Sequence, residues 1–127
     1  MKAIDTLLRS IAAFPPNSII AILDAYGGAI RRKRNEETAF AFRDALYCMQ
    51  YYSSWFDPTQ TSQRLNMMRS VYGAMRPFMP GFAYVNYCDL DLKDWQNAYW
   101  AGNVGKLRSI KTRVDGPPRT SSSKRCM

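Results

Sequence analysis

The chain contains no histidine and only three cysteines among its 127 residues. Cys48, Cys88 and Cys126 are widely spaced and form no Cys-x-x-Cys pair, so the usual ligand set of a zinc site is missing and we expect no metal. The absence of histidine also removes the commonest general base, the usual partner in a serine triad and any histidyl link to a cofactor. Any chemistry must therefore come from tyrosine, carboxylates, cysteine, lysine or arginine.

The chain also lacks a long apolar run. The longest apolar stretches, such as residues 18–26, fall far short of the roughly 20 residues needed to cross a bilayer, so we expect no membrane span. The composition, with 46% hydrophobic and 13% aromatic residues, is that of one folded domain with a modest core.

The net charge of +8 comes mainly from one end of the sequence. Residues 1–102 carry 11 basic and 9 acidic side chains, whereas residues 103–127 carry 7 basic and 1 acidic. Residues 31–34 form a basic cluster, which we interpret as a solvated loop. Because no folded face gathers lysines, arginines and stacking aromatics, we do not expect nucleic acid as a partner.

Hydrophobic periodicity predicts a helix, then strands, in the first half of the chain. Residues 2–13 show an i, i+3, i+4, i+7 apolar pattern that stops at Pro15-Pro16. Residues 18–26 are nearly all apolar and bounded by prolines and glycines, which predicts a buried strand. Residues 38–42 and 45–52 are expected to form a short and a longer strand.

The second half is predicted to begin with a long helix. Asp57-Pro58 followed by Gln60 has the form of a helix start, and the helix should run to about Arg76. We expect its inner face to consist of Leu65, Met68, Tyr72 and Met75. A strand over 82–87, a short helix ending near Gly102 and a last helix capped by Asn103 follow.

This element order indicates an α+β fold with an incomplete antiparallel sheet of three or four strands and helices on one side. We assign residues 1–115 to one region and residues 116–127, rich in Gly, Pro, Ser, Lys and Arg, to a disordered basic tail. So small a sheet would leave exposed edges, which intact proteins normally avoid, and this suggests that part of the fold is missing.

One segment carries a specific motif. Tyr84-Val85-Asn86-Tyr87-Cys88-Asp89-Leu90-Asp91-Leu92 resembles the Tyr-x-Asn-Tyr-x-Asp-x-Asp-Leu segment of the berberine bridge enzyme-like flavin oxidases. Residues 98–107 are similar to an aromatic-aromatic-Gly-x-Asn pattern of that family, with the glycine displaced by one place. The likeness covers residues 18–115, in the right order and spacing.

The resemblance implies that the chain is the C-terminal fragment of a vanillyl-alcohol-oxidase-type flavoprotein. Intact members bind FAD through a preceding region that is absent here, and they oxidise alcohols, sugars and alkaloids. The chain would contribute the substrate-side wall and the segment that passes beside the flavin ring. We do not expect this chain to bind FAD by itself. A separate FAD-binding domain is the partner that the resemblance implies.

Four residues receive roles by this resemblance. Tyr87 matches a general base, which would need help because a free tyrosine has a pKa near about 10. Asn86 and Asn103 match cofactor-binding positions, and Tyr84 matches a substrate-binding position. Spacing alone favours Tyr84 and Tyr87 as aromatic residues of a half-buried strand, and the surrounding motif is what favours the functional roles.

Two departures from the family pattern are informative. Relatives often have Phe-Pro-His-Arg where this chain reads Phe40-Ala41-Phe42-Arg43, so any role of that histidine is lost. The usual ending Asp-Pro-x-Asn-x-Phe is replaced, and residues 117–122 read Pro-Pro-Arg-Thr-Ser-Ser. A one-base shift of the reading frame converts codons for Asp-Pro-Glu-Asn-Val-Phe into codons for those six residues, and we hypothesise a frameshifted tail.

Three functions follow from these observations. The chain is a fragment of an FAD-dependent oxidoreductase without activity of its own, or a subunit of a split flavin oxidase, or a small non-enzymatic interaction protein that reuses the fragment. A separately encoded FAD-binding domain would favour the second.

Overall fold

The computed structural model describes residues 1–116 and divides them into two compact units. Unit 1 consists of residues 1–24 and 49–81, and unit 2 consists of residues 25–48 and, within the described part, 82–116. The predicted tail, apart from Gly116, lies outside the described residues. The assignment of residues 1–115 to a single family region stays a prediction.

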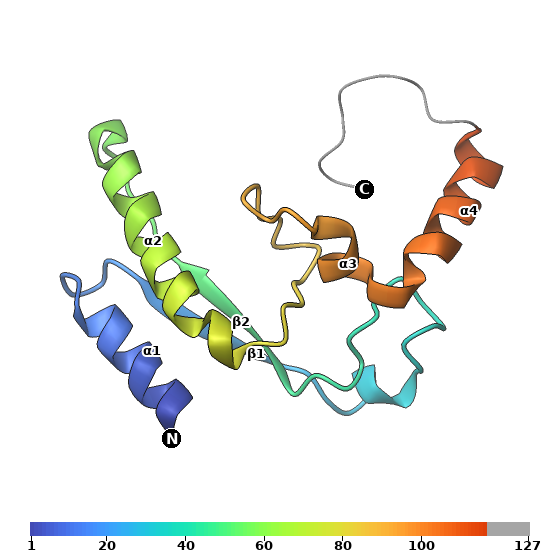
Figure 1. Cartoon of the computed structure of the whole chain (residues 1–127), viewed down its shortest axis with the longest axis horizontal. Helices are drawn as coiled ribbons and strands as arrows, with labels where there is room; N and C mark the ends of the chain where they lie inside the picture. The colour runs from blue at the N-terminus through green and yellow to red at the C-terminus, as the bar shows by residue number, and fades with distance from the viewer. Residues whose placement is uncertain (117–127) are drawn as a thin grey trace. The chain divides into compact units, whose positions relative to one another are not determined.

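Unit 1 is built on two helices, α1 (Lys2–Ala12) and α2 (Thr61–Met75), which lie side by side (Figure 1). Their contact encloses a small core of Ile19, Met67 and Val71, against which Leu7 and Ile11 pack. Both helices were predicted close to their observed bounds, because apolar periodicity and the proline stops define them strongly.

The start of α2 confirms the predicted cap. The Asp57 carboxylate accepts a hydrogen bond from the Thr59 amide at 2.9 Å, and Pro58 occupies the first position of the turn that leads into the helix. This hydrogen bond lowers the pKa of Asp57 below its ordinary value of 3.8. Gln60 does not close a capping box, since its side-chain oxygen accepts from Arg64 instead.

The predicted inner face of α2 is correct at Met68 and Met75 but wrong at Leu65 and Tyr72. Met67, Val71 and Met75 are the buried residues, whereas Leu65 and Tyr72 are 37% and 39% exposed. The helix carries apolar residues around much of its circumference, so the pattern could not decide which stripe faces the core.

The sheet has two antiparallel strands, β1 (Ile20–Ala25) and β2 (Tyr47–Tyr52). Just beyond the strands, the Tyr26 amide donates to the Leu46 carbonyl at 2.8 Å, and the Ser53 hydroxyl donates to the Ser18 carbonyl at 2.7 Å. The mixed helix and strand fold is therefore confirmed, but with two strands among the described residues rather than three or four.

Strand β1 was expected to be buried, and it is not. Ile20 and Leu23 are 47% and 55% exposed, because the helices of unit 1 pack on Ile19 and Tyr51 and leave these positions uncovered.

The two extra strands were predicted where the backbone is irregular. In residues 84–87 the Tyr87 amide donates to the Tyr84 carbonyl at 3.0 Å, which closes a turn. Residues 38–42 are bound by side chains instead of by a neighbouring strand. An aromatic, β-branched composition favours a strand only where a partner strand is present.

Unit 2 contains α3 (Trp95–Trp100) and α4 (Val104–Asp115), joined by a 3₁₀ turn over Ala101–Asn103. Both helices agree with the predicted ranges. The predicted side-chain cap by Asn103 is wrong, because its backbone is already helical and its amide is used elsewhere. In the described part of the chain, none of the helices is long and apolar enough to cross a membrane.

Candidate functional site

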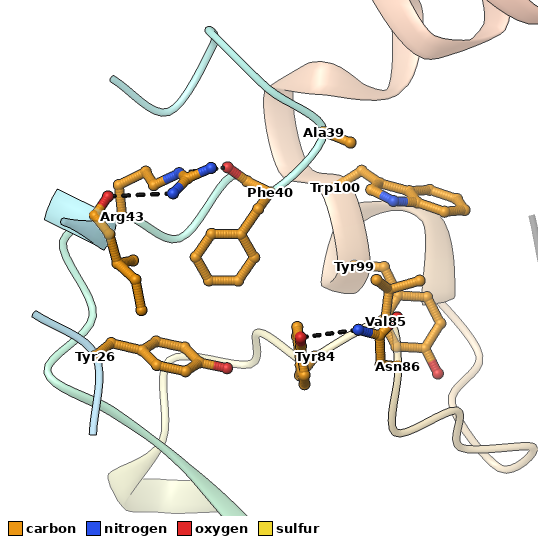
Figure 2. A pocket seen from close by; sticks show the side chains of 10 residues that line it. Tyr26, Ala39, Phe40, Arg43, Tyr84, Val85, Asn86, Tyr99 and Trp100 are labelled. Atoms are coloured by element: carbon orange, nitrogen blue, oxygen red, sulfur yellow. Dashed lines mark hydrogen bonds between the residues drawn. The ribbon is translucent and has the colours of Figure 1, made fainter. Parts of the chain in front are cut away.

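A cavity of about 330 Å³ lies in unit 2, within the range of small-molecule sites. Its wall is mainly aromatic (Figure 2). The residues that line it come from the strand end, the irregular segment after it, the 84–87 turn and α3: Tyr26, Ile30, Ala39, Phe40, Arg43, Tyr84, Val85, Asn86, Tyr99 and Trp100.

The aromatic rings of this wall meet edge to face. Phe40 lies between Tyr26 and Tyr84, with ring centroids 5.4 and 6.0 Å apart, respectively. The ring centroids of Tyr84 and Tyr26 lie 6.2 Å apart, also edge to face. Such pairs are worth about 0.5–1.5 kcal/mol each beyond the area that they bury, so the rings help to hold one another in place along an apolar wall.

The 84–87 turn brings three of the predicted site residues together. The Asn86 amide nitrogen donates to the Tyr84 phenol oxygen at 2.8 Å, and both side chains line the cavity (Figure 2). The Tyr87 ring lies 5.2 Å from that of Tyr84, but Tyr87 is 42% exposed and is not among the described residues that line the cavity.

Two hydrogen bonds to residues of α3 hold the 84–87 turn in place. The Ala83 amide donates to the Ala98 carbonyl at 2.9 Å, and the Asp89 amide donates to the Tyr99 hydroxyl at 2.8 Å. These two hydrogen bonds flank the motif on both sides. The motif therefore has a defined position in unit 2 without forming a strand.

Asn103 lies apart from these three residues. It is 5% exposed, and its amide nitrogen donates to the carbonyls of Asn35 and Thr38 at 2.7 and 3.0 Å. It lines a smaller cavity of about 100 Å³, together with Glu37 and Lys106 among others. The structure thus brings Tyr84, Asn86 and Tyr87 together and leaves Asn103 as an anchor of the 35–38 segment.

The smaller cavity includes a carboxylate held in its charged form. The Arg34 amide donates to Glu37 at 3.1 Å and, with a smaller contribution from Lys33, lowers the pKa of Glu37 below its ordinary value despite opposing desolvation. Of the residues that the structure describes, no three His, Cys, Asp or Glu side chains are grouped so as to hold a metal ion.

The sequence did not single out Phe40 or Arg43 as site residues. Arg43 is the one charged side chain among the ten that line the larger cavity. A signal was present, since an arginine directly after the apolar stretch 39–42 must either reach solvent or find oxygen acceptors.

The lost histidine position is filled by an aromatic ring. Phe42 is 8% exposed and stacks on Phe82 with ring centroids 4.3 Å apart and planes at 21°. Apolar packing therefore occupies the position where the family resemblance implied a histidine.

Residues 83–117 match the family model described as "Berberine and berberine like". The chain is 29% identical over 114 residues to an uncharacterized FAD-linked oxidoreductase, YgaK, of Bacillus subtilis, covering 90% of this chain and 25% of that protein. It is 30% identical over 117 residues to Berberine bridge enzyme-like 3 of Arabidopsis thaliana, covering 78% of this chain and 22% of that protein.

The structure is similar to that of wild-type BBE-like 1 of Physcomitrella patens, with a TM-score of 0.81 and 26% identity over 90% of this chain and 24% of that one. Sequence and fold thus relate the chain to FAD-linked oxidoreductases. Within that class it resembles the berberine bridge enzyme-like family. The chain spans about a quarter or less of the length of these relatives, as a fragment would.

Proposed function

We propose that this chain is the C-terminal fragment of an FAD-dependent oxidoreductase of the berberine bridge enzyme-like type and supplies the substrate-side wall of its active site. The observation that carries the proposal is the aromatic cavity of unit 2, whose Tyr84-Val85-Asn86 edge lies inside the segment that matches the family model. As part of this proposal, residues 1–127 by themselves would have no oxidase activity, since they span about a quarter of the length of an FAD-linked relative.

The residues of the cavity are chemically suited to one side of a flavin ring. Rigid aromatic edges and an amide side chain can flank a planar heteroaromatic group, and Asn86 and Tyr84 are the residues that would lie against it or against the substrate. The chemistry that FAD supplies when bound is acceptance of a hydride. Asn103 would contribute to cofactor binding through the 35–38 segment that it anchors.

Tyr87 is proposed as the general base. Deprotonated with the help of a nearby cation or of the bound cofactor, its phenol oxygen would take the proton from the substrate hydroxyl, while Tyr84, whose oxygen already accepts from Asn86, would donate a hydrogen bond that orients the substrate. The exposed position of Tyr87 fits a residue whose contacts are completed by an FAD-binding domain.

That domain is the partner that we propose. Ile20 and Ile22, which share one face of β1, are large apolar residues that are 47% and 37% exposed, and relatives that contain the same region are about four times longer. A separately encoded FAD-binding domain that covers this surface would make the chain a subunit of a split oxidase.

The proposal is tested with the chain co-expressed with such a domain. Purified together, the pair should reduce its flavin when mixed with an alcohol, sugar or alkaloid from a substrate panel. Tyr87→Phe should slow this reduction by on the order of 100-fold with flavin content unchanged. Tyr47→Phe, a tyrosine of similar exposure in β2, is the matched control. Equal rates for both variants would remove Tyr87 as the base.

A non-enzymatic interaction protein is the alternative outcome. It would be favoured if the chain bound another protein in place of an FAD-binding domain, with no flavin in the complex.

A further inference from the structure

One wall of the larger cavity is built from a segment with little regular structure. Apart from one 3₁₀ turn over Ile30–Arg32, residues 30–44 belong to no helix or strand. Because such a segment has no ladder of backbone hydrogen bonds, side chains must satisfy its polar groups and hold its conformation.

Arg43 binds this segment at three points. Its guanidinium donates through Nε to the Phe40 carbonyl at 3.3 Å, through Nη1 to the Ile30 carbonyl at 3.2 Å, and through Nη2 to the Thr38 hydroxyl (Figure 2 draws the Arg43 hydrogen bonds to Ile30 and Phe40). These acceptors span the segment from 30 to 40. Only the planar, forked guanidinium presents donors in three fixed directions at once.

A second anchor meets the same segment. Asn103 donates to the Asn35 and Thr38 carbonyls, and the Asn35 side-chain oxygen accepts from the Arg43 amide at 2.9 Å. Asn103 therefore fixes the segment against the start of α4, and Arg43 fixes it against the cavity.

Arg43 affects the shape of the cavity through its contacts with Phe40. The Arg43 guanidinium carbon lies 5.0 Å from the centroid of the Phe40 ring, within the range of a cation–π contact. The same residue thus holds both the Phe40 carbonyl and the Phe40 ring, and this ring contacts Tyr26 and Tyr84 edge to face.

We propose that Arg43 is the positioning residue of the cavity: its guanidinium fork sets the Phe40 ring against Tyr84 and so preforms the aromatic wall before any cofactor or substrate is present. The meaning of this wall as part of an oxidase site rests on the proposed function. The preforming itself is a property of this chain alone.

The test is NMR spectroscopy of the full chain, isotopically labelled at its aromatic residues, without flavin. In the wild type, Phe40 and Tyr84 should show a cross-relaxation peak, and the Tyr84 ring resonances should carry the ring-current shift of a neighbouring phenyl edge. Arg43→Lys keeps the charge but not the fork, so we expect loss of the peak and movement of the Tyr84 resonances. The indole resonances of Trp95 should stay in place, which separates a local displacement from unfolding.

Arg32→Lys is the matched control, because it makes the same change on the exposed end of the same segment. It should reproduce the wild-type spectrum. An Arg43→Lys variant that keeps the Phe40–Tyr84 peak and the Tyr84 shifts would overturn the proposal.

If the Arg43→Lys variant fails to fold, the same NMR measurement on the Thr38→Val variant tests the proposal. It removes one acceptor of the fork while leaving Arg43 in place, and it should move the same Tyr84 resonances by a smaller amount; unchanged resonances would contradict the proposal. Because all these spectra are recorded without flavin, absence of a flavin complex would count against the proposed function and leave this result standing.

Discussion

Ala101 has a backbone conformation that alanine rarely adopts. Its φ of 44° and ψ of −126° lie in a region that is favourable essentially only for glycine. In the aromatic-aromatic-Gly-x-Asn pattern, the glycine falls at this position, after Tyr99 and Trp100. The displaced glycine noted in the sequence therefore has a structural cost, because Gly102 follows one residue too late.

Ala101→Gly should stabilise unit 2 by about 1–3 kcal/mol, since it removes this backbone strain. The measurement is the free energy of unfolding in urea. Gly102→Ala is the control: its added Cβ meets no atom within 4 Å, and it should change stability by less than about 1 kcal/mol. A destabilised Ala101→Gly variant would show that the turn does not need a positive φ at this residue.

Residue identities predicted the site only in part. The Tyr-x-Asn-Tyr motif indicated Tyr84 and Asn86, which do line one cavity, but the motif gives no sign that Asn103 is committed to two backbone carbonyls. Long-range hydrogen bonds of this kind join residues more than sixty positions apart, and no local pattern encodes them.

At the scale of elements, the helices and the two paired strands, β1 and β2, could be predicted from the sequence, whereas the two other expected strands could not. A helix satisfies its backbone internally, so apolar periodicity suffices to predict α1, α2 and α4. A strand needs a partner. The residues expected to form strands at 38–42 and 82–87 have suitable composition, yet among the described residues they have no strand to pair with.

The buried face of α2 gives a direct test of the packing. Met67, which is not on the predicted face, is 6% exposed, so Met67→Ala should cost about 2–5 kcal/mol in the free energy of unfolding. Leu65→Ala, on the face that periodicity favoured, should cost much less because Leu65 is 37% exposed. Calorimetric or urea unfolding of both variants measures the difference. Equal losses would place the core on the face that the sequence predicted.

The cap of α2 should make stability depend on pH. Because the folded-state pKa of Asp57 lies below 3.8, its carboxylate stabilises the fold above that value, and this stabilisation is lost as the pH falls through the folded-state pKa. Asp57→Asn keeps an acceptor without a titrating group. Wild type should therefore be more stable than Asp57→Asn at neutral pH, and the gap should close in acid; a gap that does not change with pH would contradict this cap.

At the scale of the whole chain, the proposed function assigns the described residues to one side of an active site. Unit 2 contains a rigid aromatic cavity with Arg43 at one side, while the apolar strand β1 in unit 1 remains uncovered. Its relatives place the same region within proteins about four times longer. The aromatic wall of the cavity, the 84–87 turn held against α3 and the exposed apolar side chains of β1 all support the proposal that this chain is part of a flavin oxidase.

The most direct test of this account is the visible absorbance of bound flavin, measured on the chain with added FAD and on the chain co-purified with a separately encoded FAD-binding domain. We predict no retained flavin for the chain alone and a retained flavin spectrum for the pair, which should change when Tyr84→Ala removes part of the wall. A pair that forms with flavin whose spectrum does not respond to Tyr84→Ala, or a chain that assembles with no FAD-binding domain, would contradict the claim that this chain forms a wall of a flavin site.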